Sequence, residues 1–254
     1  MFNLLKKRNN SKRPRIYYLE VPITNNCNLS CNICAHHCNL IDKEQFADIE
    51  QFKKDITELS KKIDIGFFKL SGGEPLLTQN ICDFIEISRK LLPDSYIVIH
   101  TNGILLPQMK NEFWEALRNN KIALDISKLP ISSDKFSQML DLIDDNDITL
   151  HSVFLRKKCC DNFNKEGTSE PQKAFDACIY RKKLTLWKQK LYTCYACYRE
   201  IYNKHYETNL PLPNAIDIYS STGNEIEEQI YKPSQACRFC REQLIFLPRE
   251  TYIK

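Results

Sequence analysis

Three cysteines with the spacing Cys27-x3-Cys31-x2-Cys34 follow directly after an apolar stretch that is typical of a strand. Three thiolates in so short a segment can ligate three irons of a four-iron cluster and leave the fourth iron open. An open iron can bind a small molecule, whereas a closed four-ligand site mostly carries electrons or stabilises structure. The alternative is a zinc knuckle, which needs a fourth ligand nearby. Candidates for that ligand are His36, His37 and Cys38. The triplet itself favours iron.

Two later strand ends carry glycine-containing turns. A predicted strand over 65–70 leads into the sequence SGGEP, and a predicted strand over 96–100 leads into TNG. Each turn alone is an ordinary signal for a change of chain direction. In this order after the cysteine triplet, the two turns closely resemble the radical S-adenosylmethionine (AdoMet) superfamily, and the apolar Ile33 before the third cysteine fits the same pattern.

The resemblance implies a fold, a cofactor and a set of contacts. The fold is of the α/β class, a partial (β/α)6 barrel with a small C-terminal extension. The cysteine triplet would hold a [4Fe–4S] cluster whose open iron chelates the amino and carboxylate groups of AdoMet. Ile33 would pack near the adenine, and Gly72, Gly73 and Glu74 would lie against the methionine amino group. Glycine is expected there because a Cβ would block the close approach of backbone and ligand.

Polar residues at the other strand ends are further candidates. Thr101 and Asn102 end one predicted strand and could touch the ribose or methionine groups of AdoMet, or simply form a turn. Asp125 and Ser127 flank the end of the next strand and could bind ribose or the substrate, or serve as caps. We include Thr101, Asn102 and Ser127 in the expected AdoMet site. The sequence identifies no catalytic residue.

Composition narrows the class of protein. The chain has 254 residues, and none of its apolar runs is long enough for a transmembrane helix or a signal peptide. Its 12 cysteines therefore indicate metal ligation in a reducing cytoplasm and argue against a disulfide framework. A net charge of +4 gives no reason to expect nucleic acid, and the basic segment 6–15 resembles a solvated terminus. We expect a cytoplasmic protein with no membrane or nucleic-acid partner.

Strands and helices alternate through the first two thirds of the chain, which predicts a parallel sheet. The expected strands are 16–24, 65–70, 96–100, 121–126 and 149–155, and the expected helices are 42–63, a segment around 81–87, 108–119 and 133–142. We cannot place a sixth strand. The predicted regions are a basic arm (1–15), a barrel core (16–158) and an auxiliary-cluster region (159–254), which begins with a polar crossing segment over 159–177.

A second group of cysteines lies in the last third of the chain. Its members are Cys178, Cys194, Cys197, Cys237 and Cys240. Their order around a predicted hairpin over 184–193 resembles the twitch domain, the shortened auxiliary-cluster domain of many radical AdoMet enzymes. The resemblance implies that Cys178, Cys194, Cys237 and Cys240 fully ligate a second [4Fe–4S] cluster. The longer form of this domain has a glycine where this chain has Gln189, which leaves the geometry of the turn open.

Two other uses of these cysteines remain open. Cys194 and Cys197 could pair with Cys237 and Cys240 in a four-cysteine zinc site, although this interpretation leaves Cys178 unexplained. Cys197 could also replace Cys194 as a ligand of the iron cluster.

The resemblance implies reductive cleavage of AdoMet to methionine and a 5′-deoxyadenosyl radical, with a reductant of the flavodoxin or ferredoxin type. The radical would take a hydrogen atom from a small substrate. Segments such as 25–29, 70–77 and 217–220 look like those of bacterial proteins of surface-polysaccharide biosynthesis, which suggests oxidation or epimerisation of a sugar, cyclitol or nucleotide sugar. The alternatives are a peptide-modifying maturase and a non-catalytic metal-binding scaffold. The barrel begins too early for the peptide-binding domain common in such maturases, and a scaffold would not need the Gly-Gly-Glu turn.

Overall fold

The computed structural model describes residues 13–41, 43–128, 133–155 and 158–254, so most of the predicted basic arm lies outside the described residues. One sheet forms its centre. The strands of this sheet are β1 (Arg15–Thr24), β3 (Asp64–Gly72), β4 (Tyr96–Thr101), β5 (Ala123–Lys128), β6 (Leu150–Leu155), β8 (Leu184–Trp187), β9 (Lys190–Tyr192) and β10 (Ala215–Asp217). They lie in the order β10-β9-β8-β1-β3-β4-β5-β6. The six strands from β8 to β6 are parallel to their neighbours.

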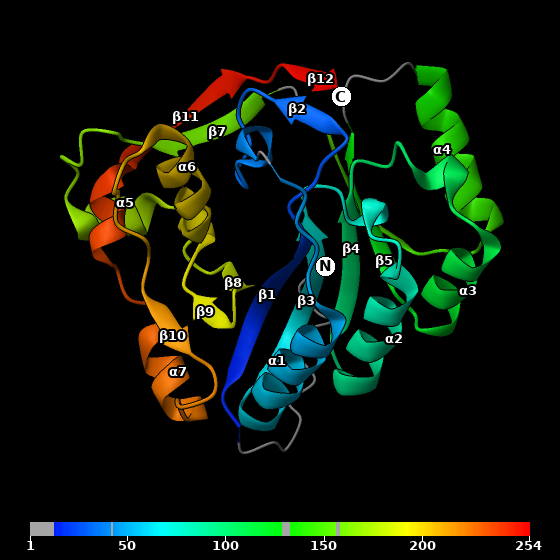
Figure 1. Cartoon of the computed structure of the whole chain (residues 1–254), viewed down its shortest axis with the longest axis horizontal. Helices are drawn as coiled ribbons and strands as arrows, with labels where there is room; N and C mark the ends of the chain where they lie inside the picture. The colour runs from blue at the N-terminus through cyan, green and yellow to red at the C-terminus, as the bar shows by residue number, and fades with distance from the viewer. Residues whose placement is uncertain (1–12, 42, 129–132, 156–157) are drawn as a thin grey trace.

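Four helices cover the outer face of the parallel strands (Figure 1). They are α1 (Ile49–Lys62), α2 (Ile81–Leu91), α3 (Asn111–Asn119) and α4 (Ser133–Asp145). Side chains alternate between the two faces of a strand, and the outward set, including the fully buried Leu19, Phe68 and Leu124, is apolar. Helix residues such as Phe52 and Phe84, whose rings lie 4.9 Å apart, belong to the same core. Each such side chain contributes roughly 1.5–3 kcal/mol through burial.

The five predicted strands are confirmed within two residues at each end, but the first helix is shorter than predicted. It begins at Ile49 and not at 42, because Phe46 forms an antiparallel bridge with Thr24 and holds the preceding segment extended. Asp48 then caps the helix, and its side chain accepts a hydrogen bond from the backbone N–H of Gln51 at 2.7 Å. The apolar periodicity before Ile49 thus serves a strand-like contact.

The sixth parallel strand is β8, which the sequence had indicated only as one arm of a hairpin. It pairs with β1, where Glu20 faces Thr185, and β9 returns antiparallel beside it. The turn between β8 and β9 has positive φ at both central residues, Lys188 (49°) and Gln189 (65°). This matches the twist of a two-residue hairpin, although neither residue is the glycine or asparagine that usually occupies such positions.

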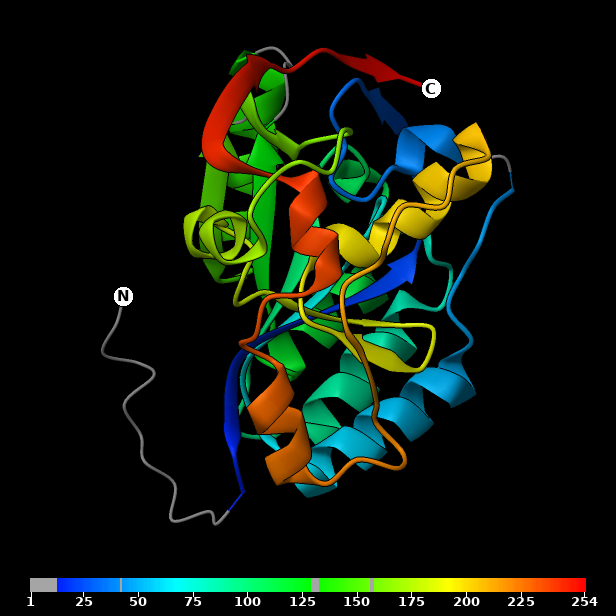
Figure 2. The ribbon, with the colours of Figure 1, turned by 90° about the vertical axis from the view of Figure 1, so that its left-hand side faces the viewer.

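The last third of the chain reaches both ends of the sheet, with its red strands at the top and its lower orange helix at the bottom of Figure 2. Its other elements are β7 (Lys158–Phe163), α5 (Pro171–Ala177), α6 (Arg199–Tyr206), α7 (Gly223–Gln229), β11 (Cys240–Pro248) and β12 (Thr251–Ile253). The predicted crossing segment 159–177 therefore contains a strand and a helix. Strand β11 pairs with β7, and β12 pairs with β2 (Leu29–Cys31) in the cysteine loop. None of the helices in the described part of the chain has the length and apolar character of a membrane span.

Candidate functional site

The structure brings the cysteine triplet together at the carboxyl end of β1. Cys27, Cys31 and Cys34 pack in one cluster with Leu29 and Ile104. Burial, together with the charges of Glu74 and the other two cysteines, raises the pKa of Cys27 to about 12. At Cys34 a hydrogen bond from the Cys38 thiol outweighs burial and lowers the pKa to about 5. The surroundings of Cys34 therefore favour its thiolate form, whereas those of Cys27 favour the thiol.

The three candidates for a fourth zinc ligand have different surroundings. Nδ1 of His36 lies 2.5 Å from the carbonyl oxygen of Gly72, and its Nε2 lies 3.0 Å from a carboxylate oxygen of Glu20. His37 packs its ring against Tyr202 at 5.7 Å. Cys38 is buried against Cys34. Both ring nitrogens of His36 therefore interact with residues of β1 and β3, and Cys38 is the candidate that contacts a cysteine of the triplet. No three Cys, His, Asp or Glu side chains in the described ranges are placed to hold a single metal ion.

The Gly-Gly-Glu turn lies directly against the cysteine loop. The backbone N–H of Gly73 donates to the carbonyl of Thr24 at 2.9 Å, and that of Glu74 donates to the carbonyl of Asn26 at 2.7 Å. A Cβ on Gly72, where φ is +142°, would lie 2.0 Å from the carbonyl oxygen of Thr24, and one on Gly73 would lie 2.1 Å from that of Asn26. The close approach seen here is between two backbones, and the expected approach to a ligand stays a prediction. A side chain at either position would displace the cysteine loop itself.

The Glu74 carboxylate is fully buried and joins the ends of two strands. It accepts hydrogen bonds from the hydroxyl of Thr101 at 2.6 Å, the backbone N–H of Asn102 at 2.8 Å and that of Leu76 at 3.1 Å. Burial raises its pKa to about 7 despite these donors. The Asn102 amide also donates to Asn28 in the cysteine loop at 2.7 Å. Glu74, Thr101 and Asn102 thus form one unit with the loop, and Ile33 is half-buried beside it.

Ser127 lies farther across the sheet, in a polar group on the inner face. Its hydroxyl is 3.0 Å from Nε2 of His100, and Nδ1 of His100 is 2.9 Å from Asp125. The predicted contact of Ser127 with AdoMet stays a prediction, and the Ser127 hydroxyl has His100 as a partner. Ser127 belongs with groups that face the interior of the partial barrel.

Our sequence reasoning missed two members of this inner face, Glu20 and Lys69. The ammonium of Lys69 lies 3.4 Å from Asp125 and 3.9 Å from Glu20, and all three side chains are buried. Burial alone would raise the pKa of Glu20, but Lys69 and His36 hold it well below its usual range. The sequence signal that could have revealed these two residues is one charged residue in each of the apolar strands β1 and β3. The two residues occupy the same register, since Glu20 and Lys69 are paired directly.

The hydroxyls of Tyr18 and Ser71 donate to the Glu20 carboxylate at 2.7 and 2.6 Å, and Tyr195 also bonds to it. Ser152 donates to Asp125. The inner face of the sheet is thus a continuous row of hydroxyl, carboxylate and ammonium groups.

The structure also brings four cysteines of the second group close together. Cys178 ends α5, Cys194 follows β9, and Cys237 and Cys240 flank the start of β11. Cys178 lies within electrostatic range of Cys237 and Cys240, and Cys194 lies within range of Cys178 and Cys240.

Cys197 has a different environment. It is fully buried, and its sulfur contacts the carbonyl of Tyr195 at 3.8 Å and the hydroxyl of Thr185. These contacts place Cys197 towards the sheet, in keeping with a structural role.

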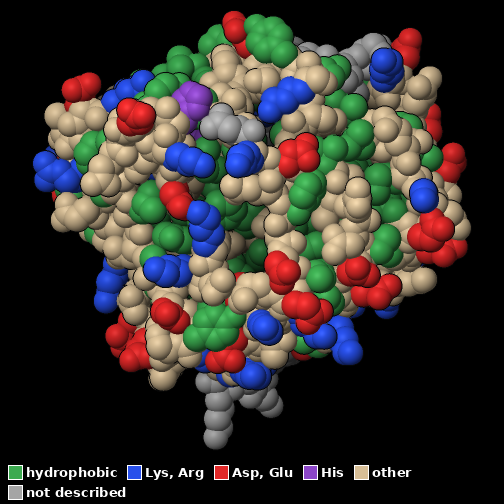
Figure 3. All heavy atoms as spheres, viewed as in Figure 1, with side chains coloured by type: hydrophobic (Ala, Val, Ile, Leu, Met, Phe, Trp, Pro, Cys, Tyr) green, Lys and Arg blue, Asp and Glu red, His purple; other side chains and the backbone are tan. Residues whose placement is uncertain are grey.

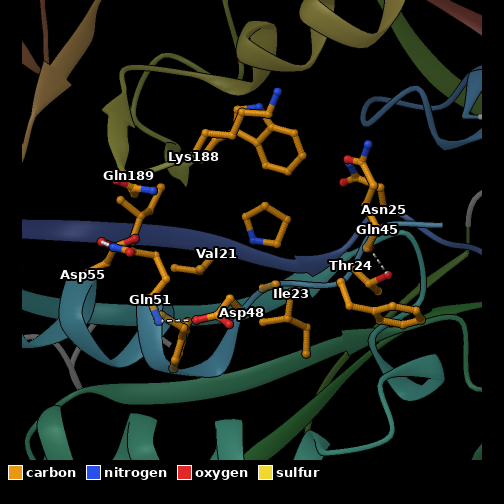
Figure 4. A pocket seen from close by; sticks show the side chains of 16 residues that line it. Val21, Ile23, Thr24, Asn25, Gln45, Asp48, Gln51, Asp55, Lys188 and Gln189 are labelled. Atoms are coloured by element: carbon orange, nitrogen blue, oxygen red, sulfur yellow. Dashed lines mark hydrogen bonds between the residues drawn. The ribbon is translucent and has the colours of Figure 1, made fainter. Parts of the chain in front are cut away.

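A separate groove of about 280 Å³ lies between α1 and the β8–β9 turn (Figure 4). It is lined by Gln45, Gln51 and Trp187 among others, and none of the predicted site residues lines it. Acidic and basic side chains are interspersed over the face of the molecule in Figure 3. Buried polar side chains and thiols are therefore concentrated on the inner face of the sheet and in the two cysteine groups.

Comparison with known proteins agrees with this geometry. Residues 21–140 match the radical SAM superfamily, where SAM is AdoMet. The GTP 3′,8-cyclase of Clostridium perfringens (strain 13 / Type A) is 31% identical over 150 residues, which are 58% of this chain and 44% of the relative. A probable GTP 3′,8-cyclase of Methanocaldococcus jannaschii is 34% identical over 109 residues, 42% of this chain and 36% of the relative. The chain thus spans less than half the length of these curated relatives.

Two solved structures resemble almost the whole chain. BtrN in complex with AdoMet and 2-DOIA superposes with a TM-score of 0.54 at 14% identity, over 91% of this chain and 98% of BtrN. The enzyme named anSMEcpe, with bound AdoMet, gives 0.57 at 13% identity, over 87% and 83% of the two chains. At these identities the likeness concerns the fold, and it confirms the predicted partial barrel with a small C-terminal extension.

The surroundings of the cysteine loop fit an iron–sulfur cluster. Three cysteines pack together, and the Cys34 thiolate is favoured. Arg249 donates to the Cys31 sulfur at 3.1 Å, and its Nε is buried without a hydrogen-bond partner in the described part of the chain. Such donors suit a group whose sulfurs accept hydrogen bonds. Cys27, Cys31 and Cys34 would hold this cluster.

The raised pKa of Glu74 predicts a pH-dependent stability. The folded protein holds this proton more tightly than the unfolded chain, because folding raises the pKa from its ordinary value of 4.5 to about 7. The contribution is complete below pH 4.5 and is lost as the pH rises through about 7. Relative to Glu74→Gln, we expect the wild type to lose up to about 3 kcal/mol of unfolding free energy between pH 4 and pH 8.

Anaerobic urea unfolding without AdoMet measures this difference. Glu58→Gln is the control, because Lys62 lowers the pKa of Glu58 and its contribution is not lost as the pH rises. A wild-type-minus-Glu74→Gln difference that stays constant with pH would contradict the assignment.

Proposed function

We propose that this protein is a radical SAM enzyme that cleaves AdoMet reductively and abstracts a hydrogen atom from a small substrate. The observation that carries the proposal is the contact of the Gly-Gly-Glu turn of β3 with Thr24 and Asn26, at the start of the loop in which the three cysteines cluster. A four-iron cluster with one open iron supplies the electron for this cleavage, and a reductant of the flavodoxin or ferredoxin type would deliver it. The protein binds and orients AdoMet and excludes water.

The expected AdoMet contacts remain proposals. They are Ile33, Gly72, Gly73, Glu74, Thr101, Asn102 and Ser127. The first six surround the cysteine loop, whereas Ser127 faces the inner polar row and is more suitably placed for a substrate. A neutral Glu74 would ionise readily when a cationic amino group approaches, because an opposite charge favours the carboxylate.

We propose a hydroxyl-rich substrate such as a sugar, a cyclitol or a nucleotide sugar. The inner face presents Glu20, Lys69 and Asp125 with several hydroxyls, and these groups suit hydrogen bonding to a polyol. In an oxidation, the substrate carbon loses a hydrogen atom to the 5′-deoxyadenosyl radical, and the hydroxyl then loses a proton. Cys178, Cys194, Cys237 and Cys240 would hold a second cluster, which would supply the acceptor for the remaining electron as a ketone forms. Epimerisation would instead return a hydrogen atom to the carbon.

The cysteine triplet provides the test of AdoMet cleavage. We expect Cys27→Ala, Cys31→Ala and Cys34→Ala each to abolish 5′-deoxyadenosine formation with dithionite under anaerobic conditions, because the open iron is lost. Cys82→Ala is the control, since Cys82 packs on the outer hydrophobic core. Full activity in any triplet variant would overturn the radical mechanism.

The second group is tested in a Cys27/Cys31/Cys34 triple-Ala background. We expect this protein to retain about four irons and four sulfides, to lose them on Cys178→Ala and to keep them on Cys197→Ala. A zinc site predicts the opposite: Cys197 would be essential, Cys178 dispensable, and no acid-labile sulfide would be found.

A substrate screen tests the polyol proposal. Sugars, cyclitols, nucleotide sugars, GTP and short peptides are compared for their ability to stimulate 5′-deoxyadenosine formation. We expect a polyol to stimulate at least about tenfold, and Asp125→Asn to abolish the stimulation while iron content and basal cleavage persist. Gln51→Ala, in the outer groove, should behave as the wild type. Stimulation by peptides alone would favour a maturase.

A further inference from the structure

The C-terminal end of the chain is seated on the cysteine loop. Strand β12 runs antiparallel to β2, with Thr251 opposite Cys31 and Ile253 opposite Leu29. The backbone N–H of Lys254 donates to the carbonyl of Asn28 at 3.0 Å. Figures 1 and 2 both show this red strand beside the blue strand β2. The loop that carries the triplet is thus held by β3 on one side and by the chain end on another.

Two donors from this segment converge on one sulfur. Nη2 of Arg249 lies 3.1 Å from the sulfur of Cys31, and the hydroxyl of Thr251 lies 3.5 Å from it. Arg249 is only partly exposed, and its buried Nε finds no partner among the described residues. A guanidinium with a free donor beside a cysteine sulfur is suited to an anionic group with acceptor sulfurs.

We propose that Arg249, assisted by Thr251, is a positioning residue that raises the reduction potential of the cluster held by the triplet; this inference rests on the proposed function. A reduced cluster carries one more negative charge than the oxidised cluster. A nearby positive charge and hydrogen bonds to the ligand sulfur therefore stabilise the reduced form more. The chain end makes the cluster easier to reduce.

The position of Arg249 depends on the second cysteine group. Strand β11 starts at Cys240 and runs to Pro248, immediately before Arg249, and it is held along its length by β7. The second group has a similar donor, because Nη2 of the buried Arg199 lies 3.0 Å from the Cys240 sulfur. An ordered second cysteine group thus fixes the start of β11, and β11 places Arg249 beside the cysteine triplet.

The test is a redox titration of the intact, anaerobically loaded protein, followed by electron paramagnetic resonance. The first cluster is recognised as the signal that changes when AdoMet is added. We expect Arg249→Gln to lower its midpoint potential, Thr251→Val to lower it less, and Arg249→Lys to fall between Arg249→Gln and the wild type. Arg241→Gln is the matched control, because Arg241 lies on β11, the strand that leads to Arg249, and its guanidinium pairs with the Asp161 carboxylate at 3.1 Å. It should leave the potential unchanged.

Each outcome decides the inference. An unchanged potential in Arg249→Gln with full iron content overturns it and leaves the proposed function intact. If Arg249→Gln does not retain iron, the near-isosteric Thr251→Val decides, and a wild-type potential in that variant overturns the inference. A shift of equal size in Arg241→Gln would show a general charge effect and would also overturn it. A wild type without any AdoMet-sensitive signal would overturn both proposals.

Discussion

The carboxyl end of β3 lies closer to the cysteine loop than any side chain would permit. Hydrogen bonds from Gly73 and Glu74 to the loop carbonyls need this approach, and the absence of Cβ atoms at positions 72 and 73 allows it. The contact fixes the start of the loop against the sheet. Through Glu74 it also binds the end of β4, so that three strand ends and the cysteines form a single unit. Ligands of parallel sheets collect at this edge, and here the edge is rigid.

The two faces of the sheet differ: the outer face stabilises the fold, and the inner face presents polar and charged groups. The outer face is apolar and packs against α1 to α4, which supplies most of the burial. The inner face holds buried charges that would be costly unless they were paired, and Lys69 between Glu20 and Asp125 provides that pairing. Such a row adds little to stability compared with an apolar one. The free-energy cost of burying these charged side chains is consistent with a role of the inner face in binding.

Much of the fold was predictable because the parallel strands are apolar runs separated by amphipathic helices. The cysteine triplet and the glycine turn were equally visible, because their spacing is local. The spacing of residues within a short segment could not predict contacts between segments that are distant in the sequence. Strand β1 has β8 as its second neighbour besides β3, and the polar neighbours Glu20 and Lys69 meet only after β1 and β3 pair in register. The start of α1 was misplaced for the same reason, since a bridge from Phe46 to Thr24 overrides the helical pattern.

The seat of β12 on the cysteine loop has a consequence for the order of events during synthesis. Arg249 and Cys31 are 218 residues apart in the chain, so they can meet only after the ribosome has added this long intervening segment. Contacts of such long range form late, because closing a long loop costs entropy before any contact is gained. The cysteine loop therefore lacks this neighbouring strand until β12 pairs with β2.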